Sequence, residues 1–341
     1  MNMSVFIFKQ FEVENSASAL KVGTDAVLLG AVVGLGWVQG GALTGDEAPG
    51  MDWVQGGALT GDEAPGMDWM QGGALTGAEA MGTGAEKAGR AGAPLRVLDV
   101  GTGTGVVALM VAQRLAKMSE QGTGSREDEG QEERSREVHE VRSNGFHIDA
   151  IDIDGPSAEE AKRNFAASPW AEHLDARHCA LAEWGHAPYD LIISNPPYFE
   201  NSLRNPDVRE SAARHADTLS YRELCEYAVA GPRTDTGGQP EGRAQLAPAD
   251  HLPGGLSPDG RLVMILPAEQ ETDLRRTAAS FGLYPARTVR IRTTGRKPPK
   301  RIVVELSRAR GPAAEEELVI QKDGEFTPEY RSYVHPFLLY L

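Results

Sequence analysis

The chain has 341 residues, a formal net charge of −15 at pH 7, 39 glycines and two cysteines. Two cysteines exclude a disulfide scaffold and a multi-cysteine zinc site, and no run of about 18 apolar residues offers a membrane span. The first residues lack the basic flank and apolar core of a secretory signal, so we expect a cytoplasmic protein without a disulfide partner. Taken alone, the net charge argues against a nucleic-acid partner.

Three low-complexity stretches interrupt the chain. The first contains the 16-residue unit WVQGGALTGDEAPGMD, which starts at Trp37, is repeated unchanged from Trp53 and decays from Trp69. The second stretch is densely charged, and the third is rich in Gly, Pro, Ala and Gln. The stretches span residues 37–93, 118–143 and 231–253. Because such sequences bury little apolar surface, we interpret them as insertions in a single domain that carry most of its negative charge. For the repeats, a flexible surface insertion is favoured over a Trp-based interaction module.

The remaining residues alternate short apolar runs with helical patterns, which predicts an α/β fold with a mostly parallel sheet. In chain order, we expect strands at 95–100, 146–153, 176–181, 189–194 and 261–266, and helices at 105–115, 157–167, 222–230 and 268–281. Two further strand-like runs, 286–292 and 301–307, flank the turn TTGRKPPK. We expect these two runs to form an antiparallel hairpin at the edge of the sheet.

A glycine-rich turn, DVGTGTG, follows the first expected strand and opens a helix. Its G-x-G-x-G spacing is one residue shorter than the dinucleotide fingerprint, which disfavours a pyrophosphate on the helix N-terminus. The tighter turn suits a ligand whose amino-acid part lies against the backbone, because glycine has no Cβ to block that approach. Asp152 ends the second strand, where a carboxylate can accept both ribose hydroxyls of a nucleoside, and Asp154 is expected to point the same way. The candidate ligand contacts of the turn are Asp99, Gly101, Thr102, Gly103 and Gly105.

The run SNPPY, from Ser194 to Tyr198, directly follows the apolar strand YDLII. Two prolines stiffen the backbone and remove two donors, which leaves the carbonyls of Asn195 and Pro196 free to accept. The Asn195 side chain adds a further acceptor, and Tyr198 adds a flat apolar face. Asn195, Pro196, Pro197 and Tyr198 together form a candidate catalytic site for a planar group that bears an NH2.

DVGTGTG, IDID and SNPPY in this order resemble the class I methyltransferases that use S-adenosylmethionine (SAM) to methylate a planar nitrogen. Longer segments are similar to the bacterial tRNA1(Val) (adenine-37 N6)-methyltransferases. These segments are FKQFEVENSASALKVGTDAVLLGA from Phe8, ASPWA from Ala167, DLIISNPPYFENS from Asp190, ARHADTLS from Ala213 and YRSYVHPFLLYL from Tyr330. The resemblance implies a Rossmann-like fold with a mostly parallel seven-stranded sheet and an antiparallel edge hairpin. It also implies SAM as cofactor, tRNA as substrate and no metal.

The same resemblance implies roles for further residues. Lys21, Gly23 and Thr24 would lie near the methionine end of SAM. Such enzymes often place an acid after the third strand to accept from the SAM adenine amine, but Ala180 stands there in this chain. Glu183 is the nearest substitute. Asn195 and the Pro196 carbonyl would bind both hydrogens of the target amine while Tyr198 stacks on the base.

A concentrated basic run lies in and beside the expected hairpin. Residues 287–310 hold nine Lys or Arg side chains and one acid, Glu305. We expect the following residues to contact a tRNA phosphate backbone: Arg287, Arg290, Arg292, Arg296, Lys297, Lys300 and Arg301. The alternative is a charged edge strand that prevents aggregation.

Two other functions compete with tRNA adenine methylation. A protein glutamine N5-methyltransferase that acts on release factors would use the same SNPPY chemistry, but it usually has a separate N-terminal helical domain, for which the residues before Trp37 leave little room. A non-catalytic RNA-binding protein of the same fold is suggested only by Ala180, and the intact SNPPY run disfavours it.

Overall fold

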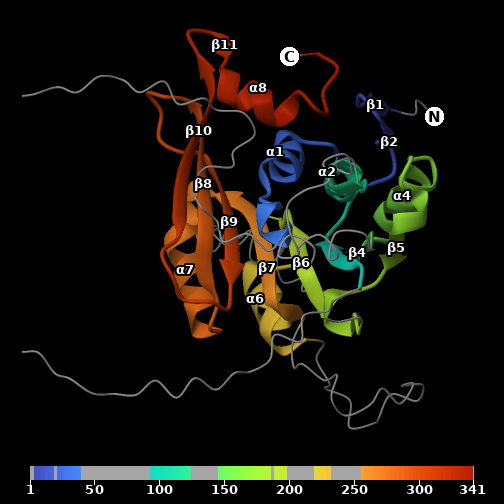
Figure 1. Ribbon diagram of the computed structural model, residues 1–341, viewed down its shortest axis with the longest axis horizontal. Helices are drawn as coiled ribbons and strands as arrows, with labels where there is room; N and C mark the ends of the chain where they lie inside the picture. Colours follow the sequence, from blue (N-terminus) through green and yellow to red (C-terminus); the bar gives the residue numbers. More distant parts are fainter. Residues whose placement is uncertain are drawn as a thin grey trace, which may run out of the picture.

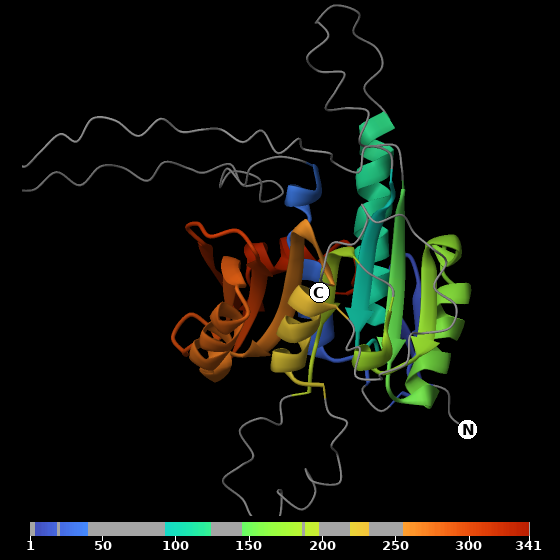
Figure 2. The ribbon, with the colours of Figure 1, turned by 90° about the horizontal axis from the view of Figure 1, so that it is seen from below.

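The computed structural model describes residues 4–18, 21–39, 93–123, 145–185, 188–197, 219–231 and 255–340. These residues form one large twisted sheet with helices on both faces and a small separate hairpin (Figures 1 and 2). Most of the three low-complexity stretches, at 40–92, 124–143 and 232–253, falls outside the described residues, as does Tyr198. No described helix has the length and apolar character that a bilayer crossing needs.

The large sheet has nine strands in the order β11-β10-β8-β9-β7-β6-β3-β4-β5. They are β3 (Leu95–Val100), β4 (Phe146–Asp152), β5 (Leu174–His178), β6 (Tyr189–Ser194), β7 (Leu256–Pro267), β8 (Tyr284–Thr294), β9 (Arg301–Ser307), β10 (Ala314–Lys322) and β11 (Glu325–Phe326). The strands from β5 to β7 in this order are parallel neighbours, whereas β9 is antiparallel to both β7 and β8. The carboxyl ends of β3, β4 and β6 therefore meet at one edge, where open α/β sheets bind their ligands.

Helices cover the sheet because side chains alternate between its two faces. The helices are α1 (Thr24–Val32), α2 (Val106–Thr123), α4 (Gly155–Ala166), α6 (Tyr221–Ala230), α7 (Glu271–Ser280) and α8 (Pro328–Val334). Leu191 and Ile193 of β6 pack in one hydrophobic layer with α1, α2, α4 and α8. Ile192, between them, packs in the other layer with α6 and α7. The result is a three-layer arrangement of the α/β fold with a mostly parallel sheet that the sequence predicts.

The expected elements are confirmed with shifted ends. β3, β6 and β9 have the predicted bounds, and the expected helix from 105 continues to Thr123, into the charged stretch that begins at 118. The third strand lies at Leu174–His178 rather than 176–181, because Leu181 begins a short 3-10 helix. The second strand ends at Asp152, one residue before the expected end.

The expected position of the hairpin at the sheet edge is wrong. β8 and β9 pair antiparallel as predicted, but β10 adds to β8 in parallel and β11 follows, so the sheet has nine strands rather than seven. The sequence AEEELVIQK of β10 has a weak strand signal, because three consecutive acids precede its one fully buried residue, Leu318. The small hairpin of β1 (Val5–Ile7) and β2 (Glu12–Glu14) also escaped the sequence analysis.

Helix α1 is fixed closely against α2. A Cβ on Gly30 would lie 2.9 Å from Met110, so only glycine permits this approach. Arg114 of α2 donates to the carbonyl oxygens of Gly30, Ala31 and Val33 at the C-terminal end of α1, at 3.1, 3.2 and 2.6 Å. These contacts satisfy carbonyls that a helix end leaves without partners. They also hold the opposite end of α1, which begins at Thr24, at the ligand-binding edge of the sheet.

Candidate functional site

The glycine-rich turn between β3 and α2 has the backbone that its sequence predicts. Gly101, Gly103 and Gly105 have φ of +72°, +57° and +81°, the left-handed region that favours glycine. The amides of Gly101 and Thr102 donate to the carbonyl of Ile151, which ties the turn to the end of β4. A Cβ on Gly105 would lie 2.5 Å from the Phe165 ring, so this glycine also allows α4 to pack against the turn.

Asp99 lies beneath this turn. Its side chain is 2% exposed and accepts a hydrogen bond from the Thr102 hydroxyl at 2.7 Å. Burial raises the pKa of Asp99 from its ordinary value of 3.8 to about 7, and the charge of Asp152 adds to the rise. Both Asp99 and Thr102, predicted as ligand contacts, therefore hold the turn from below.

Asp152 ends β4 beside the turn. Its carboxylate accepts from the amide of Gly103 at 2.8 Å and from the amide of Asp154 at 2.9 Å. Burial raises the pKa of Asp152 despite these two bonds. Asp154, expected to point the same way as Asp152, is instead the N-cap of α4, and its side chain accepts from the amide and hydroxyl of Ser157 at 2.9 and 2.6 Å.

The anchor that holds residues 14–18 beside the turn was not predicted from the sequence. The buried Glu160 accepts from the backbone amides of Ser16, Ala17 and Ser18, each at 2.7 Å. Burial alone would raise the pKa of Glu160, but these bonds lower it. One turn further along α4, the Asn164 amide donates to Thr104 of the glycine-rich turn at 2.8 Å and to the carbonyl of residue 14. The only sequence signal was this i, i+4 pair of polar residues on the inner face of an amphipathic helix.

The candidate catalytic run follows β6 at the same edge. The Ser194 hydroxyl donates to the carbonyl of Val100 at 2.8 Å, which ties the end of β6 to the end of β3. Asn195 and Pro197 are half-buried and Pro196 is buried. Tyr198, the fourth predicted member, lies outside the described residues.

Asn195 borders a cavity of about 520 Å³. The cavity is lined by Lys21, Gly23, Thr24, Asp25, Leu28, Asn195, Ile291, Thr293, Lys300, Arg301 and Ile320. The structure thus brings the predicted Lys21, Gly23 and Thr24 together with Asn195, although they lie on different elements. Lys21 is further held by a bond from its Nζ to the carbonyl of Ser16 at 2.7 Å.

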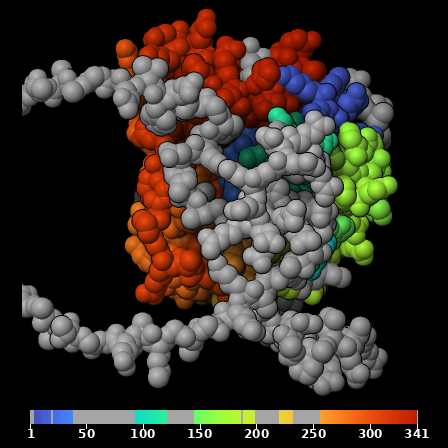
Figure 3. Space-filling view, viewed as in Figure 1, coloured from blue at the N-terminus to red at the C-terminus, as the bar shows by residue number. Residues whose placement is uncertain are grey.

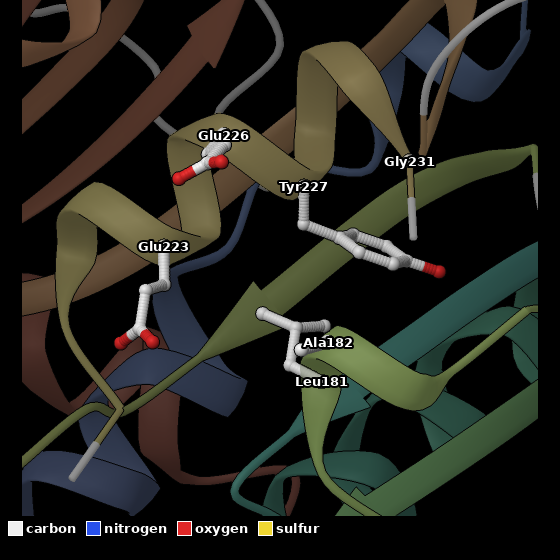
Figure 4. Close-up of a pocket in the computed structure, with 6 residues that line it drawn as sticks. All are labelled: Leu181, Ala182, Glu223, Glu226, Tyr227 and Gly231. Carbon is white, nitrogen blue, oxygen red and sulfur yellow. The ribbon is translucent and has the colours of Figure 1, made fainter. Parts of the chain in front are cut away.

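Glu183 lies apart from this cavity. It ends the 3-10 helix Leu181–Glu183 that Ala180 precedes, and its side chain is exposed. A smaller cavity forms where this 3-10 helix faces α6, with Leu181 and Ala182 opposite Tyr227 (Figure 4). Glu183 does not line that cavity. Its predicted contact with the SAM adenine stays a prediction.

The basic hairpin is largely neutralised within the fold. Arg287 pairs with Glu305 and Glu316, Arg290 with Glu271 and Glu315, Arg292 with Glu317, and Arg301 with Asp25. Half of these partners, Glu315, Glu316 and Glu317, are acids of β10, because β10 runs beside β8. Within the described part of the chain, the turn residues Arg296, Lys297 and Lys300 are exposed and form no ion pair.

The site also has a distinct charge character. Neither Asp99 nor Asp152 has a cation within ion-pair distance among the described residues, and the pKa of each is raised. Within the same residues, no group of three His, Cys, Asp or Glu side chains could hold a metal ion. A ligand with hydroxyl groups and positive charge would stabilise both carboxylates at this edge.

Comparison with known proteins points to one family. No protein-family model matches the chain. A tRNA1(Val) (adenine(37)-N6)-methyltransferase from Parabacteroides distasonis is 30% identical over 305 residues, which cover 89% of this chain and 83% of that protein. The protein with the same name from Porphyromonas gingivalis is 29% identical over 348 residues, covering 99% and 96%. Among solved structures, a predicted O-methyltransferase from Agrobacterium tumefaciens has 16% identity and a TM-score of 0.44 over 72% of this chain and 91% of that one.

Proposed function

The chain belongs to the tRNA1(Val) (adenine(37)-N6)-methyltransferase family, and we propose that it transfers a methyl group from SAM to the N6 amine of adenine 37 in that tRNA. The observation that carries the proposal is the place of Asn195. It follows β6 at the ligand-binding edge and borders a cavity with the predicted Lys21, Gly23 and Thr24. With tRNA as the substrate, we expect the reaction to take place in the cytoplasm.

The residues at the edge fit SAM, which supplies the methyl group when bound. Asp152 would accept from the ribose hydroxyls, because each carboxylate oxygen retains a lone pair beside its backbone bond. The backbone of Gly101 and Gly103 would lie along the amino-acid part, and Lys21, Gly23 and Thr24 near its far end. The raised pKa values of Asp99 and Asp152 support a positively charged ligand, which would favour both carboxylates in their ionised form.

Asn195 and Pro196 would prepare the acceptor amine. The lone pair of an adenine N6 is delocalised into the ring, so the amine is a weak nucleophile. The Asn195 side-chain oxygen and the Pro196 carbonyl would accept its two hydrogens and favour a tetrahedral nitrogen whose lone pair points at the methyl group. These bonds strengthen as positive charge develops on nitrogen, so they stabilise the transition state more than the ground state. Pro197 would stiffen this backbone, and Tyr198 would stack on the base.

The tRNA backbone would be contacted by the turn after β8. Of the predicted set, Arg296, Lys297 and Lys300 form no ion pair among the described residues, so we assign the phosphate contacts to them. The arginines of the strands pair with acids of the fold instead. The low-complexity stretches at 37–93, 118–143 and 231–253 would be insertions outside the catalytic core, with the second starting on the last turns of α2.

Asn195→Ala tests the proposal. The wild-type protein, incubated with labelled SAM and tRNA, should yield N6-methyladenosine on nucleoside analysis. The variant should lose roughly a hundredfold or more in kcat, because it lacks an acceptor aimed at the developing charge. Its Kd for SAM, measured by calorimetry, should stay within about twofold of wild type, since Asn195 acts on the acceptor.

Two results would contradict this assignment. A near wild-type kcat for Asn195→Ala would remove Asn195 from the mechanism. Methylated glutamine in a release factor, with no methylated adenosine in tRNA, would replace the proposed substrate by a protein.

A further inference from the structure

We infer that the cavity on the β8–β10 side of Asn195 is the pocket for the target nucleotide, with the base held against Leu28, Ile291 and Ile320 and a neighbouring phosphate near Lys300. The inference rests on the proposed function, because it assigns the place of that reaction's acceptor. We call this part of the cavity the acceptor pocket, and its residues are Leu28, Asn195, Ile291, Thr293, Lys300 and Ile320.

The order of strands separates two halves of the ligand-binding edge. β6, which carries Asn195 at its end, is flanked by β3, β4 and β5 on one side and by β7, β9, β8 and β10 on the other. The glycine-rich turn and Asp152 belong to the first half. Every strand residue that lines the cavity belongs to the second half. In methyl transfer the acceptor approaches the methyl carbon from the side opposite the sulfur that leaves. The acceptor therefore belongs on the half of the ligand-binding edge away from the glycine-rich turn.

The strand register brings the walls of the acceptor pocket to the same edge as Asn195. Arg301, the first residue of β9, pairs with Pro267 at the end of β7 and with Ile291 near the end of β8. β10 is parallel to β8, with Gln321 opposite Thr294, so Ile320 also lies at that edge. Ile291 packs in the hydrophobic layer of α1. The acceptor pocket therefore lies between α1 and the ends of β8 and β10.

The chemistry of the lining suits a flat base with an attached phosphate. Among the apolar lining residues, Ile320 is half-buried, and Leu28 and Ile291 are each 2% exposed, whereas Thr293 and Lys300 offer polar groups. Arg301 is paired with Asp25 at 2.9 Å, so it adds no net charge to the pocket. Lys300 forms no ion pair among the residues that the structure describes, and its ammonium remains available to a phosphate. The whole cavity, of which the acceptor pocket is a part, has a volume of about 520 Å³, which falls in the range of small-molecule sites, roughly 300–1,000 Å³.

Two neighbouring residues of β8 give a matched test. Thr293 lines the acceptor pocket, whereas Thr294 does not and points to the opposite face of the strand. Thr293→Trp should fill the pocket and lower kcat/KM for tRNA by roughly a hundredfold, because a displaced base loses its in-line geometry. Thr294→Trp adds the same bulk to the same strand end and should stay within about threefold of wild type, because its side chain lies on the face of the strand away from the pocket. Both variants should bind SAM with wild-type Kd.

A second measurement tests binding of the base in the acceptor pocket without requiring methyl transfer. An anticodon stem-loop RNA with 2-aminopurine at the target position reports base extrusion by its fluorescence. Wild type and Thr294→Trp should change this fluorescence on binding, and Thr293→Trp should not. The inference is overturned if Thr293→Trp, folded by its unfolding midpoint, methylates tRNA like wild type, or if the two variants are impaired equally. Absence of methylated adenosine with wild-type protein would instead contradict the proposed function, while the fluorescence would still test the pocket.

Discussion

The carboxyl group of Asp99, buried beneath the glycine-rich turn, makes this end of the site sensitive to pH. Its pKa is raised from 3.8 to about 7, mainly by burial. At pH values between these two pKa values, Asp99 is ionised in the unfolded chain but still protonated in the folded protein. The folded state then binds more protons than the unfolded state, so the free energy of unfolding falls as the pH rises through this window.

Asp99→Asn should remove this pH dependence. The Asn oxygen still accepts the Thr102 hydroxyl, but no charge develops in the buried position. We expect the melting temperature of the variant, relative to wild type, to be higher at about pH 8.5 than at about pH 4.5. Calorimetry of the ligand-free proteins measures this difference. A difference that stays constant over that range would mean that Asp99 is already ionised in the folded protein at low pH.

Residues of the site were predictable where the pattern is local. The three glycines, Asp152 and the SNPPY run each lie at or directly after the end of a strand, and their chemistry is contained in a few consecutive residues. Glu160 was missed because its partners at residues 16–18 lie more than 140 positions away in sequence, with 144 separating Glu160 from Ser16. Asp99 was found, but its burial, and hence its supporting role, depends on packing that a local pattern does not contain.

At the level of elements, β10 decides the role of the basic hairpin. The acids of β10 pair with the arginines of β8 in a network of ion pairs. Glu305 of β9 is a further acid of this network and lies at its centre. Glu305 is 1% exposed and accepts from Arg287 at 2.8 Å, Arg261 at 3.2 Å and the amide of Gly34 at 2.8 Å. This network joins the sheet to the segment that follows α1.

Glu305→Ala should therefore destabilise the fold strongly. It leaves Arg287 buried with one acid fewer, and breaking such a buried pair typically costs about 3–5 kcal/mol. Glu317→Ala is the matched control, because the Glu317 side chain is 55% exposed and its pair with Arg292 is worth about 0–1 kcal/mol. Urea unfolding of both variants gives the two values. Equal losses would show that the buried network adds nothing beyond a surface ion pair.

Elements with strong alternation or a flanking turn were predicted closely, as β3, β6 and β9 illustrate. β10 was missed because EEE at 315–317 reads as a solvated segment unless the arginines opposite are known. Its absence from the prediction also misplaced the hairpin at the edge and left the three arginines of β8 assigned to RNA. Because β10 was not recognised as a strand, the arginines that its acids neutralise were predicted to contact RNA.

For the whole molecule, the net charge of −15 conceals an exposed cationic turn. Replacing the turn cations together by Gln should weaken tRNA binding and lower the slope of log K against log salt by about one for each phosphate that is no longer neutralised. Filter binding at several salt concentrations measures both quantities. The cations to be replaced are Arg296, Lys297 and Lys300.

A control variant removes the same charge elsewhere. Lys162, Arg177 and Arg276 are exposed on other elements, and their joint replacement by Gln should leave the salt slope unchanged to within about one unit. An equal loss in both variants would mean that overall charge, rather than this turn, governs tRNA affinity.

Residues near the two ends of the described chain lie side by side, as the blue and red surfaces in Figure 3 indicate. Phe8 pairs with Leu338, and the Lys9 amide donates to the Phe337 carbonyl at 2.8 Å. These contacts support the small hairpin of β1 and β2, which leads directly into residues 14–18. Glu160 holds those residues beside the glycine-rich turn. During synthesis, every motif of the site emerges from the ribosome before residues 337 and 338 do. A fragment ending before Pro336 would contain all of these motifs and still lack these contacts to its first segment. The support of residues 8 and 9 therefore becomes available only after every motif of the site has been synthesised.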